Sequence, residues 1–273
     1  MKTTQPRLNH GFSLIEIAIV LVIISVLVSI VAIPLSTQLE QRRIEDTNKQ
    51  LETIKEALIG YALANGRFPC AAGPLDNGRE SLTTTAASGA CNKYIGFVPA
   101  VTLGLSPIDS SGFAVDAWGL TQNRIGYAVS RVNVPAGTIP IPPSCTLPLD
   151  NVFTKTDGMK SATMSCLGDT SLPASLSLNM LIVTTTTVTN VAAGCTPANL
   201  TTKAPFVLFS FGKNAATGGT DPDEAQNKNT SATTFVSHTP TPTGSCAGEF
   251  DDLVTWPSLN TIFARMVQAG KLP

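Results

Sequence analysis

A nearly uncharged apolar stretch at residues 12–33 is the strongest constraint on how this chain can fold. These 22 residues contain one charge, the carboxylate of Glu16. A helix of that length spans roughly 33 Å at about 1.5 Å per residue, which exceeds a bilayer core of about 30 Å. A lone carboxylate inside hydrocarbon is costly, so Glu16 needs a partner or a function. The stretch therefore predicts a membrane-spanning helix that also makes a specific contact.

The segment before this stretch is short and basic. Residues 1–11 contain Lys2 and Arg7, no acid and no apolar core, so they differ from an ordinary secretory signal. Basic residues on this side predict a cytoplasmic N-terminus, with the bulk of the chain outside. The alternative is a plain membrane anchor whose Glu16 lies near the headgroups.

The junction of the two segments resembles the class III prepilin leader of type IV pilins and type II secretion pseudopilins. The residues that carry the resemblance are Gly11, Phe12, Ser13, Leu14, Ile15 and Glu16. It covers roughly residues 7–65 and implies cleavage by prepilin peptidase after Gly11, with N-methylation of the new terminus at Phe12. It further implies insertion in the inner membrane and a periplasmic globular domain. An assembly platform would then build the subunit, with other pilin or pseudopilin subunits, into a helical pilus or pseudopilus.

The physical chemistry of the cleaved terminus agrees with this resemblance. Cleavage leaves a positive amine on Phe12, and a buried carboxylate needs a positive partner. We expect Glu16 of one subunit to pair with the Phe12 amine of a neighbour during assembly.

The helix is expected to continue beyond the membrane, with an interruption at Pro34. An apolar stripe recurs at helical spacing and fades at Asn65 and Gly66, a C-terminal signal. The stripe comprises Leu39, Ile44, Leu51, Ile54, Leu58 and Tyr61. The predicted organisation is a leader at 1–11, a transmembrane and assembly helix at 12–35, its amphipathic continuation at 36–66 and a periplasmic globular domain at 67–273. The fold class is α+β, with a long helix packed on a small antiparallel β-sheet domain, as in pilins.

Within the globular domain, short strands are expected in 124–132, 176–188 and 206–211. Stretches 73–90, 134–149 and 213–247 are rich in turn residues and are expected to be loops. A late helix is expected at 258–269, with Ser258 as its cap and Gly270 as its end.

Composition argues against an enzyme and against direct nucleic-acid binding. The formal net charge is −1, and loss of Lys2 and Arg7 with the leader would leave −3, with no basic patch. His10 would leave with the leader, so His238 would be the single histidine of the mature chain. His238 is expected to be a solvated loop residue, and no acid–base constellation surrounds it in the sequence.

The cysteines all follow the predicted membrane segment. An even number in an oxidising compartment predicts three disulfides, although six cysteines allow 15 pairings. Free thiols in the core are the alternative. The residues are Cys70, Cys91, Cys145, Cys166, Cys195 and Cys246.

The globular domain carries a second resemblance, to the C-terminal domain of the major pseudopilin of type II secretion. It rests on Asp116-Ala117-Trp118-Gly119, Tyr127, Leu208-Phe209-Ser210-Phe211-Gly212 and Asp251-Asp252-Leu253-Val254-Thr255-Trp256. In that family the loop between the last two elements binds calcium. This chain departs from the pattern in its long segment between Tyr127 and Leu208, its longer loop and its C-terminal helix.

Oxygen ligands concentrate in and after that loop, and calcium takes six to eight such ligands. Candidates are Asn214, Asp221, Asp223, Glu224, Asp251 and Asp252. Of these, Asp221, Asp223, Asp251 and Asp252 are the predicted calcium ligands; ordinary surface acids are the alternative. The sequence thus predicts a structural pilus or pseudopilus subunit. The alternative is a minor pilin whose globular domain binds a surface or DNA through the segment between Tyr127 and Leu208.

Overall fold

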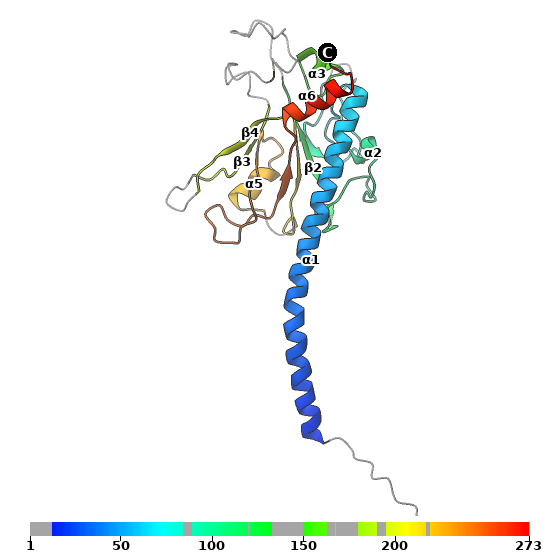
Figure 1. Ribbon diagram of the computed structural model, residues 1–273. Helices are drawn as coiled ribbons and strands as arrows, with labels where there is room; N and C mark the ends of the chain where they lie inside the picture. Colours follow the sequence, from blue (N-terminus) through cyan, green and yellow to red (C-terminus); the bar gives the residue numbers. More distant parts are fainter. Residues whose placement is uncertain are drawn as a thin grey trace, which may run out of the picture. The chain divides into compact units, whose positions relative to one another are not determined.

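The computed structural model describes residues 13–83, 89–119, 121–132, 150–162, 167, 180–189, 195–216 and 219–272, with the backbone alone at 29–36 and 161–162. The chain divides into two compact units, residues 1–43 and 44–273. Helix α1 (Leu14–Asn65) runs through both, from blue to cyan in Figure 1.

In the first unit, α1 exposes every side chain from residue 14 to residue 28, nearly all of them apolar. The predicted interruption at Pro34 is wrong, because α1 passes through this residue without a break. A proline removes one backbone hydrogen bond, so a long helix can continue on both sides of it. Within the part of the chain that the structure describes, no helix combines the length and apolar character needed to cross a membrane.

In the second unit, the last turns of α1 present a buried stripe to the core. Leu51, Ile54 and Leu58 are at most 2% exposed, which confirms the centre of the predicted stripe. Thr47 and Ala62 extend the stripe by a turn on each side, at the same helical spacing. The helix ends at Asn65, as predicted, and Gly66 follows with a left-handed φ of 69°.

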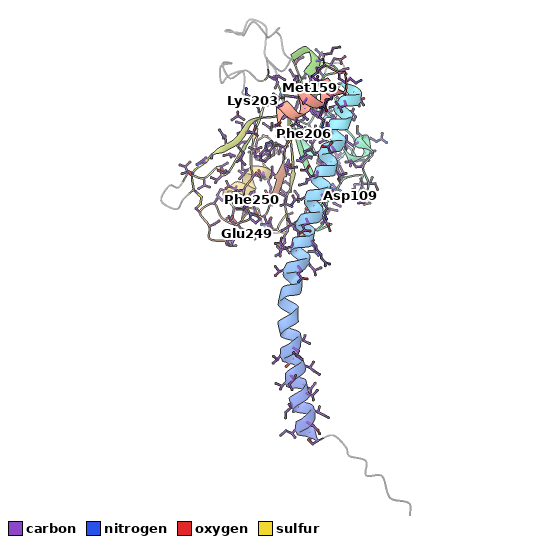
Figure 2. All side chains as sticks on the ribbon, viewed as in Figure 1. Asp109, Met159, Lys203, Phe206, Glu249 and Phe250 are labelled. Atoms are coloured by element: carbon purple, nitrogen blue, oxygen red, sulfur yellow. A yellow bond between two sulfur atoms is a disulfide. The ribbon has the colours of Figure 1, made fainter. Side chains whose placement is uncertain are left out.

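These helix residues pack on a four-stranded antiparallel sheet with the order β1-β2-β5-β7. Its strands are β1 (Ile95–Phe97), β2 (Gly126–Val129), β5 (Phe206–Ser210) and β7 (Leu253–Thr255). Phe206, labelled in Figure 2, and Leu208 join the core beneath α1 and α6 (Leu259–Gln268). Every residue of β2 and β5 is buried, because both faces of the sheet are covered.

The opposite face of this sheet packs against a second, three-stranded sheet with the order β4-β3-β6. It contains β3 (Leu181–Thr184), β4 (Asn199–Ala204) and β6 (Thr234–Val236). Val207 and Phe209 of β5 meet Val183 and Phe235 in a second apolar cluster. The pair β3–β6 is parallel, whereas the other strand pairs are antiparallel. The α+β class is confirmed, with this parallel pair as an addition.

The shorter elements lie around the sheets. In the described part of the chain they are α2 (Ala100–Leu103), the 3-10 helix η1 (Thr121–Asn123), α3 (Gly158–Ala162) and α5 (Pro222–Lys228). The prediction of a loop throughout 213–247 is wrong, because this stretch contains α5 and β6. The predicted late helix is confirmed as α6, and the Ser258 hydroxyl accepts a hydrogen bond from the Thr261 N–H. The predicted loop 134–149 lies outside the described residues.

Among the described residues, two disulfides link the domain, Cys70–Cys91 and Cys195–Cys246, with Cα–Cα distances of 5.5 and 6.1 Å. Each joins cysteines that are neighbours in the sequence order. Cys145 and Cys166 lie outside the described residues. Within the described part of the chain no cysteine is free, so two of the three predicted bridges are confirmed.

Candidate functional site

The first candidate site is the start of α1, where Ser13 and Glu16 cap the helix for each other. The Glu16 N–H donates to the Ser13 hydroxyl, and the Ser13 N–H donates to a Glu16 carboxylate oxygen, both at 3.3 Å. This Ser-x-x-Glu capping box satisfies two backbone donors that a helix start otherwise leaves unpaired. Glu16 is exposed, so its carboxylate remains accessible to a further partner. Gly11 and Phe12, the predicted cleavage and methylation residues, lie outside the described residues.

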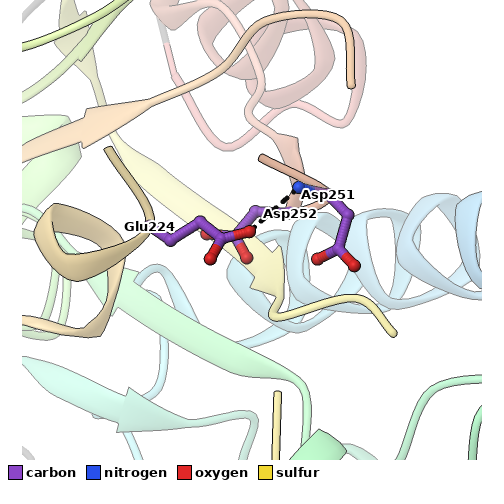
Figure 3. Close-up of side chains that lie close together, drawn as sticks. All are labelled: Glu224, Asp251 and Asp252. Carbon is purple, nitrogen blue, oxygen red and sulfur yellow. Dashed lines mark hydrogen bonds between the residues drawn. The ribbon is translucent and has the colours of Figure 1, made fainter. Parts of the chain in front are cut away.

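The second candidate site is an acidic cluster in the globular unit. Glu224 on α5 and the consecutive pair Asp251 and Asp252, just before β7, each offer a carboxylate oxygen within 4.8 Å of the others. Figure 3 shows the three carboxylates drawn together, with the Asp251 N–H bonded to Glu224. Glu224 is fully buried and Asp252 is 3% exposed. Segments 27 residues apart in the sequence thus place three acids at one point.

Neighbouring amides use some oxygens of this cluster and leave others unpaired. The Asn214 side-chain amide donates to both oxygens of Glu224, at 2.9 and 3.1 Å. One Asp251 oxygen accepts from the Lys213 and Asn214 N–H groups. One Asp252 oxygen accepts from the Asn227 amide at 2.8 Å. Within this group, three buried oxygens have no hydrogen-bond partner: Asn214 Oδ1, Asp251 Oδ1 and Asp252 Oδ1.

The electrostatics of the cluster disfavour three negative charges. Burial, with the Glu224 charge as a further cause, raises the pKa of Asp251 to about 6. Burial raises the pKa of Asp252 well above its ordinary value; the Asn227 hydrogen bond opposes the shift, and the charges of Glu224 and Asp251 add to it. A buried carboxylate is tolerated when it is protonated, paired or bound to a cation. The cluster therefore requires either protons or a positive ion.

The residues present fit a hard divalent cation. Three carboxylates and the Asn214 carbonyl oxygen are the ligand types that calcium prefers, and backbone carbonyls and water commonly complete its shell of six to eight oxygens. Three of the buried side-chain oxygens that lack a hydrogen-bond partner among the described residues belong to this group, and this observation favours a cation over surface charge.

Two of the four predicted calcium ligands lie elsewhere. Asp221 precedes α5, and its carboxylate accepts a hydrogen bond from the Glu249 N–H at 3.0 Å. Asp223 is fully buried, and one of its oxygens accepts from both the N–H and the hydroxyl of Thr187, at 2.8 Å. Asp251 and Asp252 are brought together, with Glu224 and Asn214 in place of Asp221 and Asp223.

Helix α5 explains this difference. Successive residues on a helix point about 100° apart, so Asp223 and Glu224 cannot face the same site. The sequence contains a signal for this helix, since Asp221 is followed by Pro222 and two acids, the pattern of a helix start. A helix that begins at this signal places Asp223 and Glu224 on different faces.

The prediction of a solvated His238 is wrong. Its ring stacks on Phe250 at 3.9 Å between centroids, and its side chain is 18% exposed. Its Nε2 lies 3.5 Å from a carboxylate oxygen of Asp223. Burial lowers the pKa of His238, but the neighbouring Asp223 carboxylate and the Thr239 carbonyl together outweigh burial and raise the pKa overall.

The residues that carry the resemblance to the major pseudopilin also lie close together in the fold. The Ser210 hydroxyl donates to the buried Asp116 carboxylate at 2.5 Å, and the Trp118 N–H donates to the same residue. Tyr127 of β2 pairs with Leu208 of β5, and Phe209 pairs with Val254 of β7. Elements far apart in the sequence therefore form one connected region.

Comparison with known proteins gives a match at the N-terminus. Residues 6–32 match the family model of the prokaryotic N-terminal methylation motif. No curated protein and no solved structure was found to match the chain. The matched residues include Gly11, Phe12 and Glu16, which are the residues singled out in the sequence.

Proposed function

We propose that this chain, which carries the prokaryotic N-terminal methylation motif at residues 6–32, is a structural subunit of a type IV pilus or type II secretion pseudopilus. The observation that carries the proposal is the match over residues 6–32. Prepilin peptidase cleaves after Gly11, and the new Phe12 terminus is methylated. The subunit waits in the inner membrane, with its globular domain in the periplasm, until it is drawn into the filament.

The exposed apolar surface of α1 supports assembly through this helix. Residues 14–28 have no cover within the described chain, and Leu14 is 91% exposed. An apolar helix of this kind has two stable environments, lipid and the helices of neighbouring subunits. In a filament the same head-to-tail contact repeats from subunit to subunit, so each helix buries its surface against identical neighbours.

Glu16 would set the register of that contact. Its carboxylate is already held at the helix start by Ser13, so little side-chain freedom is lost when it binds a neighbour's Phe12 amine. An amine left unpaired among apolar helices would cost several kcal/mol, which disfavours packing in the wrong register.

We further propose that the acidic cluster binds calcium and stabilises the globular domain. The cation would join α5, the loop at Asn214 and the approach to β7 by replacing repulsion between Glu224, Asp251 and Asp252 with attraction. The role is structural.

Replacement of Gly11 by a bulky residue tests the proposed function. Gly11→Leu should leave the precursor uncut, because the peptidase must fit its active site around the residue before the bond, and the uncut protein should be absent from sheared filaments. Asn9→Leu, within the same leader, is the matched control and should be processed. A Gly11→Leu chain that is cut and assembled normally would contradict the proposal.

A further inference from the structure

A pocket of about 440 Å³ opens on the face of the first sheet that carries Phe209, beside the C-terminal end of α5. Small-molecule sites in proteins typically measure about 300–1,000 Å³, are mostly apolar and hold a few polar groups. None of Glu224, Asp251 and Asp252 is among its lining residues, although Asn227, which lines the pocket, donates a hydrogen bond to Asp252.

The floor of the pocket is aromatic. Phe209 of β5 pairs with Gly126 of β2, and its ring lies across this glycine so closely that any side chain on Gly126 would collide with it. Phe211 lies next to Phe209, with 5.4 Å between ring centroids. Ile95 and Phe97 of β1, both half-buried, continue the apolar surface. Such a surface favours a flat apolar group that can stack on the rings.

The charged side chains of the pocket are positive, whereas the net charge of the chain is negative. Its charged lining residues, among those described, are Lys93 and Lys228, and no acid lines it, although the chain has a net charge of −1. Lys93 is exposed at the mouth, and the Lys228 ammonium lies 5.6 Å from the centroid of the Phe211 ring. Gln122 and Thr230 add neutral hydrogen-bonding groups. The polar part of a ligand here would therefore meet positive charge.

We propose that this pocket binds a small amphipathic anion, a carboxylate on a planar apolar body. The apolar body stacks on Phe209 and Phe211, where burial of apolar surface supplies most of the affinity. The carboxylate faces Lys93 and Lys228, which select an anion over a neutral analogue of the same shape. This ligand site would be independent of assembly through α1.

A matched pair of probes tests the proposal: a fluoronaphthoate and the neutral fluoronaphthamide of the same shape. Binding is followed by fluorine NMR line broadening on the full chain in lipid nanodiscs, with empty nanodiscs as the blank. The naphthoate should show saturable broadening, and the naphthamide should bind about fivefold more weakly, the scale of a partly exposed ion pair. Lys93→Gln should reduce naphthoate binding toward the naphthamide level, because Lys228 alone then faces the carboxylate. Lys93 is the chosen lysine because Lys228 also acts on Asp252.

A second pair of variants locates the site. Thr230 lines the pocket and Ser231, its exposed neighbour, does not. Thr230→Trp should fill the pocket and abolish naphthoate binding, whereas Ser231→Trp should bind as the unmodified protein does. The proposal is overturned if binding is not saturable, if the two probes bind equally, or if both tryptophan variants retain binding. Lys93→Gln preserves the pocket wall, so it remains informative if Thr230→Trp fails to fold.

Discussion

Removal of divalent cations should destabilise the globular unit, and conversion of Asp252 to asparagine should remove most of this effect. In the native chain the cation offsets the repulsion of Glu224, Asp251 and Asp252, so calcium raises the melting temperature and chelator lowers it. Asp252→Asn replaces a buried carboxylate, which without a cation is either protonated or charged at a cost, by a neutral group of the same shape. This variant should therefore be more stable than the native chain in chelator, and should gain little from calcium.

The magnitude follows from the ligand set. Exported calcium modules with a few protein ligands have a Kd of about 10⁻⁴ to 10⁻³ M. With a Kd near 10⁻⁴ M and about 2 mM calcium, binding to the folded state contributes about 1.8 kcal/mol. For a unit of this size, each kcal/mol shifts the melting temperature by about 2–4 °C, so the expected rise is about 4–7 °C.

The assay is thermal unfolding of the full chain in detergent, with calcium or with chelator, followed by circular dichroism. Asp221→Asn is the matched control, because Asp221 lies nearby but bonds to the Glu249 N–H outside the cluster, and it should keep the full calcium response. Identical melting curves with calcium and with chelator would refute the cation site. An equal loss of response in Asp221→Asn and Asp252→Asn would refute its assignment to the three acids.

Three further predictions address the rest of the molecule. Glu16→Val should insert in the membrane yet be incorporated poorly into sheared filaments; normal incorporation would leave Glu16 as a helix cap alone. Thiol labelling of the unfolded, unreduced protein should modify no cysteine, and two or more labelled cysteines would contradict three bridges. Burial raises the pKa of Glu80, but its hydrogen bonds and ion pair with Arg67, at 2.8 Å, outweigh this and lower the pKa overall. The contribution of the Glu80–Arg67 pair to the free energy of unfolding is thus present at neutral pH and is lost as the pH falls through the folded pKa of Glu80. Glu80→Gln should cost about 1–3 kcal/mol in urea unfolding at neutral pH and nearly nothing once the pH has fallen below the folded pKa of Glu80; a cost independent of pH would contradict the ion pair.

Helices α1 and α6 and the central strand β5 could be predicted because their signals are local. The stripe through Leu51, Ile54 and Leu58 repeats at helical spacing, and Ser258 and Gly270 mark the two ends of α6. Strand β5 is a short apolar run bounded by Pro205 and Gly212. In each case the residues that decide the structure lie within about 20 positions of one another.

The second sheet could not be predicted because its pairing is not local. The parallel partners of β3 and β6, such as Ile182 and Thr234, are separated by more than 50 residues, including β4, β5 and α5. Helix α5 is too short to display an apolar stripe, and its polar residues resemble a loop. Buried hydrogen bonds determine its position instead, such as that from Asn227 to Asp252.

The sequence predicts that oxygen ligands concentrate in this region, but it does not predict which of them form the candidate cation site. The sequence placed six oxygen-bearing residues in two segments, but it could not show which of two adjacent acids faces the site. The structure turns Glu224 toward Asp251 and Asp223 toward Thr187, because the helix rotates consecutive side chains apart. The capping role of Glu16 was also missed, although Ser13-x-x-Glu16 is a recognisable capping box.

The mass of the mature protein tests the central claim most directly. Intact mass spectrometry of the chain purified from membranes, with sequencing of its N-terminal peptide, reports both the cleavage site and the methyl group. A subunit of the type IV pilin-like family should lack residues 1–11 and begin with N-methylated Phe12. A mature chain that retains Met1 to Gly11, or that begins at another residue, would contradict the account.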